Sequence, residues 1–283
     1  MDSVATHTKQ SPSLMPAVLK DMIGHRILIA ELVRRHMGMR TSGTVLGLLW
    51  WVLTPLILLI AYMFAFRFIM GVRWPEGAES APSTMSHATR LFAGLIVYQF
   101  FSESIIAASS QILNNEQYAR RVVFPIQVLP VVPVATAAVG LLISTAVLIV
   151  MVALTGGPIH AAAIFAPIAM LPALLCALGL AWFAAAFCVF VRDIEHLIRV
   201  GMLGVLFLSP IFYPLSRLED AAGRWIAFVH PLAVSMEQTR ACVFDPSQIG
   251  SWAWVSGVGI GLALIYSGYA FFQRLRPAMV DVL

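Results

Sequence analysis

The first chemical question in this sequence concerns Glu103, a carboxylate inside the apolar stretch "YQFFSESIIAASSQ". An ionisable side chain at the centre of a membrane span costs roughly 3 kcal/mol, so its presence needs a reason. Two readings are open. Glu103 contacts water or polar groups of a substrate in a channel, or it pairs within a helix bundle and only holds helices together. A proton relay is disfavoured, because the apolar segments offer Glu103 no Lys or His partner.

Aromatic side chains recur along the same apolar segments. Trp50 and Trp51 stand shortly before Pro55, which removes one helical hydrogen bond and bends a helix. Tryptophan prefers the headgroup boundary of a bilayer, so the pair either anchors its helix there or lines a portal where the rings stack on sugars. Tyrosine hydroxyls in apolar spans need a partner, either water in a channel or a neighbouring carbonyl. The predicted channel-lining set is Trp50, Trp51, Tyr62, Tyr98, Phe101, Glu103 and Tyr213.

A basic cluster, Arg34, Arg35 and Arg40, lies just ahead of the Trp pair. One reading makes these residues ordinary positive charges on the inner side of a membrane. The other makes them a phosphate-binding site, because a guanidinium pairs bidentately with phosphate. In the second reading, the neighbouring tryptophans would receive the groups attached to that phosphate.

These residues belong to a chain of 283 residues that is 60% hydrophobic and 11% charged. Soluble domains carry roughly 25% charged residues, and a membrane-spanning helix needs about 20 apolar ones. The sequence therefore predicts an all-α integral membrane protein with six transmembrane helices. The six apolar runs lie at about 45–70, 91–112, 130–154, 161–191, 200–212 and 252–272, and prolines interrupt the short fifth run.

The region ahead of the first span differs in character from the spans. Val18 and Met22 share one face of a helical projection, and Asp21 and Arg35 share the other, which is typical of a helix lying in a membrane interface. The predicted parts are a disordered cytoplasmic tail at 1–16, an amphipathic interfacial helix at 17–40 and a six-span domain at 41–283. The cysteines form no framework, so we expect no disulfide and no metal site.

Six spans place both ends of the chain on the same side of the membrane. With the N-terminus inside, the inner segments hold 12 of the 18 Lys and Arg residues and the outer segments hold the other 6, which favours cytoplasmic termini. Residues 209–245 then lie outside, and their apolar content predicts short re-entrant helices buried by protein. In the last span, the G-x-x-x-G spacing of Gly257 and Gly261 predicts close helix packing inside the subunit.

Four stretches of the chain carry motifs of a known family. A Leu-Gly-x-x-Trp-x-x-x-x-Pro arrangement begins at Leu46, after the basic amphipathic helix. The other three are "RRVVFPIQVLPVVPV", "RDIEHLIRVGMLGVLFLSPIFYPLSRL" and "HPLAVSMEQTRACVF", the last with His230 where the family has Asn. From about residue 20 to 275 the chain resembles the ABC-2 type permeases that export polysaccharides. Lipopolysaccharide O-antigen exporters fit best, followed by capsule and teichoic-acid exporters.

This resemblance implies a homodimer that works with two copies of an ABC ATPase subunit on the cytoplasmic face of the bacterial inner membrane. The implied substrate is a polyprenyl-linked polysaccharide, whose pyrophosphate Arg34, Arg35 and Arg40 would bind. Membrane lipids surround the chain, and no nucleic acid partner is expected. The sequence contains no G-x-x-x-x-G-K-[ST] phosphate loop, so we expect a transporter subunit rather than an enzyme. ATP and Mg would be held by the partner, with no cofactor on this chain.

Two polar stretches are the predicted contacts with that ATPase. "LNNEQYARRVVFP" has the length of a short helix that docks into a groove, and in the family this segment is the coupling helix. "RDIEHLIR" is the second inner contact, and a solvated loop is the alternative for each. The predicted coupling residues are Asn114, Glu116, Tyr118, Arg120, Arg121, Arg192 and Asp193.

Two other functions remain open on sequence grounds. An ABC-2 exporter of a small lipid or drug would have a narrow cavity without a continuous aromatic track. An ATP-independent channel or secondary carrier would have no ATPase partner.

Overall fold

The computed structural model describes residues 14–41, 46–64, 84–119, 124–154, 160–212, 230 and 232–282. Every regular element in these ranges is a helix, as the sequence predicts. The α-helices are α1 (Leu14–Gly24), α2 (Arg26–Thr41), α3 (Trp50–Phe64), α4 (Thr84–Ser109), α5 (Glu116–Ala119), α6 (Val131–Leu154), α7 (Ala166–Ala169), α8 (Leu171–Phe190), α9 (Ile194–Leu208), α11 (Ala233–Phe244) and α12 (Ser251–Val282). Short 3-10 turns are η1 (Gly47–Leu49), η3 (Leu113–Asn115), η4 (Ile126–Val128), η5 (Ala161–Phe165) and η7 (Pro246–Gln248).

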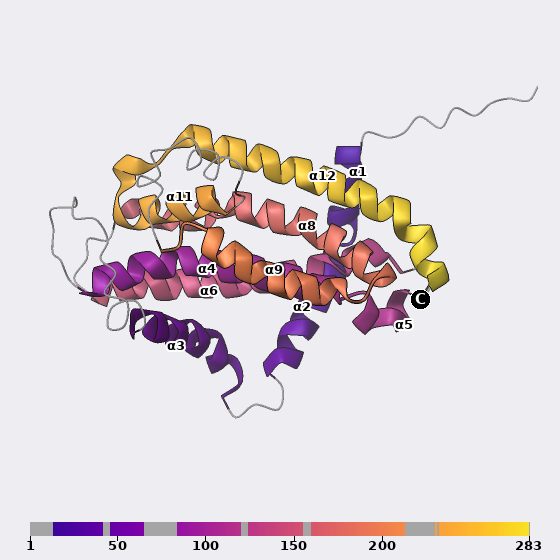
Figure 1. Ribbon diagram of the computed structural model, residues 1–283, viewed down its shortest axis with the longest axis horizontal. Helices are drawn as coiled ribbons and strands as arrows, with labels where there is room; N and C mark the ends of the chain where they lie inside the picture. Colours follow the sequence, from indigo (N-terminus) through magenta and orange to yellow (C-terminus); the bar gives the residue numbers. More distant parts are fainter. Residues whose placement is uncertain are drawn as a thin grey trace, which may run out of the picture.

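Four long helices, α4, α6, α8 and α12, run side by side and form the body of the molecule (Figure 1). Within the described residues, four segments are long and apolar enough to cross a membrane. They are Ala88–Ser109, Ile126–Leu154, Ala161–Phe190 and Trp252–Met279. Each has at least 22 residues, against the ~20 that a bilayer requires. The chain is therefore a helical membrane protein, and four of the expected spans are confirmed as long apolar helices.

The other two expected spans are shorter in the described residues. Helix α3 has 15 residues and starts at Trp50, after a turn in which Gly47 adopts a φ of 47°. The end of the expected first span, 65–70, lies outside the described residues. Helix α9 also has 15 residues and starts at Ile194 rather than Val200. Its first turns hold charges that suit a helix, because Glu195 pairs with Arg199 one turn later at 2.5 Å.

The tightest helix contact lies between α8 and α12, and glycines make it possible. A Cβ on Gly261 would lie 2.6 Å from the Cβ of Leu175, and one on Gly257 would lie 3.1 Å from the Cβ of Pro172. The prediction that these glycines pack inside the subunit is confirmed. The close approach continues further along α12, where Gly268 faces the backbone of Gly179.

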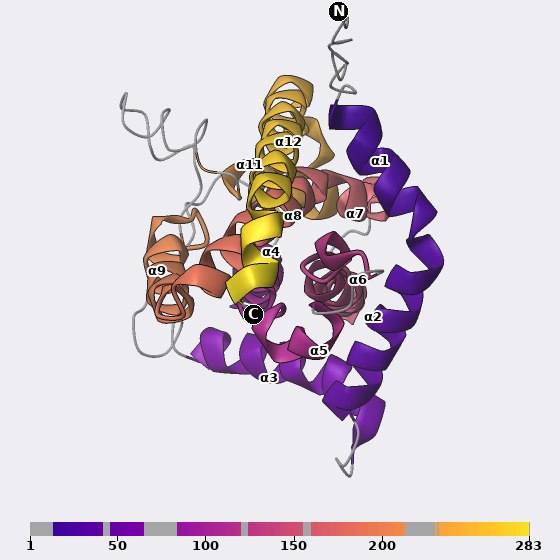
Figure 2. The ribbon, with the colours of Figure 1, turned by 90° about the vertical axis from the view of Figure 1, so that its right-hand side faces the viewer.

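The N-terminal helices α1 and α2 cross outside the bundle, and the end-on view shows them running from beside α12 towards the start of α3 (Figure 2). Val18 and Met22 pack on the bundle, as the apolar face predicts. Asp21, expected on the opposite face, also reaches the bundle. Its carboxylate accepts hydrogen bonds from the Tyr269 hydroxyl and from Nε2 of Gln127, the latter at 3.2 Å. Helix α1 is therefore docked on protein, which is why part of its polar face is turned inward.

Candidate functional site

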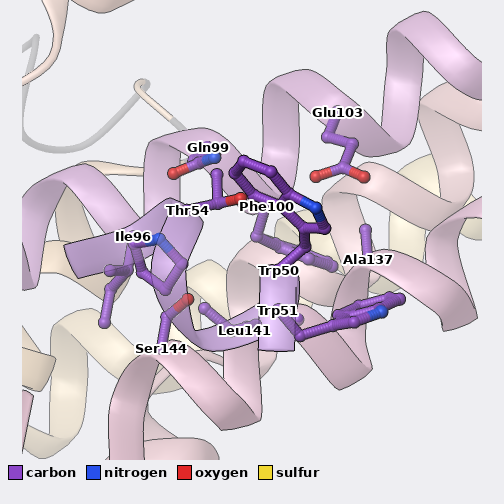
Figure 3. A pocket seen from close by; sticks show the side chains of 12 residues that line it. Trp50, Trp51, Thr54, Ile96, Gln99, Phe100, Glu103, Ala137, Leu141 and Ser144 are labelled. Carbon is purple, nitrogen blue, oxygen red and sulfur yellow. The ribbon is translucent and has the colours of Figure 1, made fainter. Parts of the chain in front are cut away.

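A cavity of about 300 Å³ lies between α3, α4 and α6 and contains three of the predicted channel residues (Figure 3). Aromatic, apolar and polar side chains from all three helices meet there. The lining residues are Trp50, Trp51, Thr54, Pro55, Ile96, Gln99, Phe100, Glu103, Ala137, Gly140, Leu141 and Ser144.

Helix α3 contributes the aromatic wall of this pocket. Trp50 and Trp51 sit in its first turn, and Thr54 follows one turn later on the same side, as the 3.6-residue repeat requires. Trp50 is 42% exposed and Trp51 is half-buried. The Trp51 ring lies against α6 at Gly140, where an added Cβ would be 3.3 Å from the ring. The absence of a side chain at Gly140 thus provides the space for the indole.

Helices α4 and α6 contribute the floor and most of the polar groups. Gln99 and Glu103 are one turn apart on α4, both half-buried, beside the fully buried Phe100. Ser144 faces them from α6. The pocket therefore combines flat aromatic faces with hydrogen-bonding groups from separate helices, an arrangement that suits a ligand with both C–H faces and hydroxyls.

Two other predicted channel residues, Tyr98 and Phe101, do not line this pocket. The Tyr98 hydroxyl donates a 2.8 Å hydrogen bond to the Met202 carbonyl of α9, so a protein carbonyl supplies one partner for this hydroxyl. Phe101 is 2% exposed and packs in the core, away from the pocket. The side chain of Tyr62 and the whole of Tyr213 fall outside the described residues.

The basic cluster lies on α2, and one member contacts a predicted coupling residue. Arg34 and Arg35 are both exposed, and the Arg40 side chain is outside the described residues. Nη1 of Arg35 donates a 2.6 Å hydrogen bond to the Tyr118 hydroxyl of α5. The Tyr118 ring packs on Phe124, with ring centroids 5.2 Å apart. Helix α2 is thus joined to the segment expected to face the ATPase, a link that the sequence pattern does not reveal.

The predicted coupling residues that the structure describes gather at one end of the bundle. Figure 1 shows α5, the turn before α9 and the C-terminal end of α12 together, with α11 at the opposite end. Asn114 is exposed just before α5, Glu116 is exposed at its first position, and Arg192 and Asp193 are exposed before α9. Arg120 and Arg121 lie outside the described residues.

At the opposite end, Arg240 of α11 is a structural residue that sequence reasoning missed. Its side chain is 4% exposed, and its guanidinium donates to the carbonyls of Arg90 (3.1 Å), Pro210 (2.7 Å) and Ile211 (2.8 Å). It also pairs with Glu237 at 3.0 Å. These bonds hold α11 against α4 and against the residues that follow α9.

His230, the position at which the chain departs from the family motif, lies next to this junction. Its Nδ1 accepts a 3.3 Å hydrogen bond from the Leu232 amide, and its Nε2 lies 3.4 Å from the Ser209 hydroxyl. Burial lowers the pKa of His230. The side chain therefore ties the start of α11 to the end of α9.

Four long apolar helices, two of which line the pocket together with α3, define a helical membrane protein. The chain matches the ABC-2 type transporter family over residues 28–244, and it belongs to that family. The matched range runs from α2 to the end of α11 and includes the whole pocket.

Individual relatives agree with this assignment. The chain is 25% identical over 269 residues to the O-antigen export system permease protein RfbA of Myxococcus xanthus, covering 94% of this chain and 99% of that protein. It is 22% identical over 258 residues to the O-antigen export system permease protein RfbA of Klebsiella pneumoniae, covering 90% of this chain and 95% of that protein.

Proposed function

We propose that this chain is the membrane-spanning subunit of an ATP-driven exporter of lipid-linked polysaccharide, with O-antigen as the substrate, in the bacterial inner membrane. The observation that carries the proposal is the pocket in which Trp50, Trp51 and Glu103 meet. Sugars need flat apolar surfaces for their C–H faces and polar groups for their hydroxyls, and the pocket offers both. The similarity to O-antigen permeases along almost the whole chain supports the same substrate.

The proposed assembly is a homodimer of six-span subunits with two ATPase subunits on the cytoplasmic side. The described parts of both predicted coupling stretches and the C-terminal end of α12 lie at one end of the bundle, which supports a shared docking face with a cytoplasmic C-terminus. Residues 209–245 would lie at the outer end with their re-entrant helices. ATP and Mg would be bound by the partner subunits.

The proposed mechanism begins when the ATPase subunits close on ATP and push α5. The Arg35–Tyr118 hydrogen bond passes that movement to α2, which leads along the chain to α3 and its Trp pair. A shift of α3 relative to α4 and α6 changes the pocket and lets the polymer advance. Weak, repeated contacts favour such movement, because tight binding at one site would stall it.

Arg34, Arg35 and Arg40 are the proposed ligands for the pyrophosphate of the polyprenyl carrier. All three belong to α2, on the chain segment immediately before the Trp pair. The bond from Arg35 to Tyr118 does not exclude this role, since a guanidinium has five N–H donors and can hold a second partner.

The decisive experiment reconstitutes the chain in proteoliposomes with and without its ATPase. The chain alone should hydrolyse no ATP, and the two-plus-two complex should move lipid-linked polysaccharide in an ATP-dependent way. The double variant Trp50→Ala/Trp51→Ala should assemble normally and lose most of that transport. Transport of a small lipid or drug, with polysaccharide left behind, would replace the proposal by the small-substrate alternative.

A further inference from the structure

The N-terminal arm, which consists of α1 and α2, carries an inference that rests on the proposed function and specifies its mechanism further. We propose that Asp21 is a positioning residue for transport. It holds α1 fixed on the bundle, so that α2 pivots about the break between the two helices when α5 moves.

The Asp21 carboxylate lies where α1 meets three other elements. It accepts hydrogen bonds from the Tyr269 hydroxyl of α12 and from Nε2 of Gln127 in η4. Gln127 is 5% exposed, and its backbone carbonyl accepts a 3.0 Å hydrogen bond from Nε1 of the buried Trp182 of α8. The Trp182 and Tyr269 rings pack edge to face, with centroids 5.3 Å apart. Both donors to Asp21 are thus held by the bundle, and a charged acceptor strengthens each bond.

The two helices of the arm differ in how firmly they are packed. Val18 of α1 is 6% exposed, and Met22 packs on the same buried cluster as Tyr269. Among the described side chains of α2 none is fully buried, and Ile29, near the start of the helix, packs on that cluster. Met39, near the end of α2, is 57% exposed. Helix α1 is therefore the fixed part of the arm, and α2 is held less tightly towards its end.

The helical path of the arm is interrupted at His25, between the end of α1 and the start of α2. Nδ1 of His25 donates a 2.8 Å hydrogen bond to the Asp21 carbonyl, which also accepts the His25 amide hydrogen at 3.0 Å. A side chain that inserts into the helical ladder in this way is a known cause of kinks. Gly24 precedes the break, with its φ outside the left-handed region and nothing within 4 Å of an added Cβ. Neither space nor conformation requires glycine there, so its contribution is flexibility.

The other end of the arm is joined to α5 through the Arg35–Tyr118 hydrogen bond. Arg35 follows His25 by about 10 residues, which is ~15 Å of helix at a rise of ~1.5 Å per residue. With α1 fixed, a displacement of α5 turns α2 about the break and moves the end of α2 that leads to α3. If α1 were free, the arm would slide along the bundle and take up the same displacement.

The first test follows the arm by double electron–electron resonance in the transporter–ATPase complex, reconstituted in lipid nanodiscs with one labelled copy of this chain. Cys176, Cys188 and Cys242 are replaced, and one spin label is placed at Trp252 of α12, which is 76% exposed. The second label is placed on α1 or on α2.

The label on α1 replaces Ile23, which is 59% exposed, and the label on α2 replaces Met39. On addition of a non-hydrolysable ATP analogue, the distance from Met39 to Trp252 should change by ~2–5 Å and the distance from Ile23 to Trp252 by less than ~1 Å. Equal changes at both positions would show that the arm moves as one body and would overturn the inference. A Met39 distance that stays constant would overturn it too.

The second test measures the ratio of transport to ATP hydrolysis, which a loss of folded complex does not change because both activities fall together. Asp21→Ala should lower this ratio at least ~3-fold, because it removes two charge-assisted hydrogen bonds. Asp21→Glu retains the carboxylate acceptor and should keep the ratio within about twofold of wild type. Glu31→Gln, which removes an exposed carboxylate of α2, is the matched control and should leave the ratio unchanged. A ratio that Asp21→Ala leaves intact rules out a positioning role.

A pair of glycine variants locates the pivot. Gly24→Ala favours a straight, stiffer helix and should lower the ratio about twofold. Gly38→Ala adds the same methyl group within α2, where it also meets nothing within 4 Å, and should leave the ratio unchanged. Equal losses in the two variants would contradict a pivot at the break.

The two tests also separate this inference from the proposed function. An arm that pivots in a complex that exports no polysaccharide contradicts only the proposed function. Polysaccharide export with a ratio that does not depend on Asp21 contradicts only the positioning role.

Discussion

Two charged side chains of this helical bundle, Arg240 and Glu103, are placed in opposite ways. Arg240 is 4% exposed, and carbonyls from two other segments together with Glu237 surround its guanidinium. Glu103 is half-buried in the wall of an open cavity, next to aromatic rings.

Under the proposed function, the difference separates a structural charge from one that would face the substrate. A buried guanidinium with several hydrogen bonds fixes the elements around it, because moving any of them leaves a polar group unsatisfied. A carboxylate that lines a cavity can exchange water for ligand hydroxyls. The bonds of Arg240 therefore fix the α11 end of the bundle, and under the proposed function the α3 side is the part that contacts substrate.

The largest expected effect comes from removing the Arg240 guanidinium and its hydrogen bonds. Arg240→Met removes the hydrogen bonds that three carbonyls accept, of which those of Pro210 and Ile211 are buried, and should destabilise the protein by roughly 3 kcal/mol. This loss of stability is measured by heating the purified protein and using the labelling of its buried cysteines to monitor unfolding. Arg199→Gln is the control, because its ion pair with Glu195 is exposed and should contribute less than about 1 kcal/mol. An Arg240→Met protein as stable as wild type would remove the distinction drawn between the two ends.

The next largest effect should appear in transport, with stability unchanged. Trp51→Ala removes the aromatic surface of the pocket and should reduce substrate-stimulated ATP hydrolysis by the complex about tenfold. The midpoint of thermal unfolding should shift by only a few degrees, since the ring lies on a cavity. If unfolding suffers more than transport, Trp51 is a packing residue like Arg240 and the comparison fails.

A smaller effect is expected at the joint between α2 and α5. Arg35→Gln and Tyr118→Phe each remove the hydrogen bond that links these helices and should lower the transport-to-ATPase ratio by about 2- to 10-fold. The double variant should be no worse than Arg35→Gln alone, because both substitutions remove the same contact. Arg26→Gln, at an exposed arginine of α2 outside the proposed phosphate-binding set, leaves this bond intact and should keep the ratio. Additive losses in the double variant would show that the bond does not transmit movement.

The smallest effect should come from filling the space beneath the Trp51 ring. A Cβ at Gly140 would lie 3.3 Å from the ring, so Gly140→Ala requires the indole to shift by a few tenths of an ångström. Sugar affinity should fall about two- to threefold. Gly259→Ala provides the control, because a Cβ there meets nothing within 4 Å. Equal affinities in the two alanine variants would mean that the ring is already free to move.

The long helices were predictable, whereas their contacts were not. Four apolar runs became helices of spanning length, since length and hydropathy suffice for that prediction. Tyr98 shows the limit. Its hydroxyl was recognised as needing a partner, yet the Met202 carbonyl that accepts its hydrogen bond lies 104 residues further along the chain. Asp21 shows the same limit, because the face pattern of α1 could not indicate that its polar side meets Tyr269.

By itself, the sequence determined that this chain is a helical membrane protein, and its motifs indicated the family. The sequence also indicated Trp50, Trp51 and Glu103 as candidate channel residues. Only the tertiary structure decided that these three line one cavity with Gln99 and Ser144, and that Phe101 belongs to the core. The physical reason is that lipid and protein interior are both apolar, so hydropathy does not reveal which face of a helix meets a neighbour. That choice depends on how α3, α4 and α6 rotate and pack against one another. Gly140 is an example, because its lack of a side chain leaves space for the indole of Trp51.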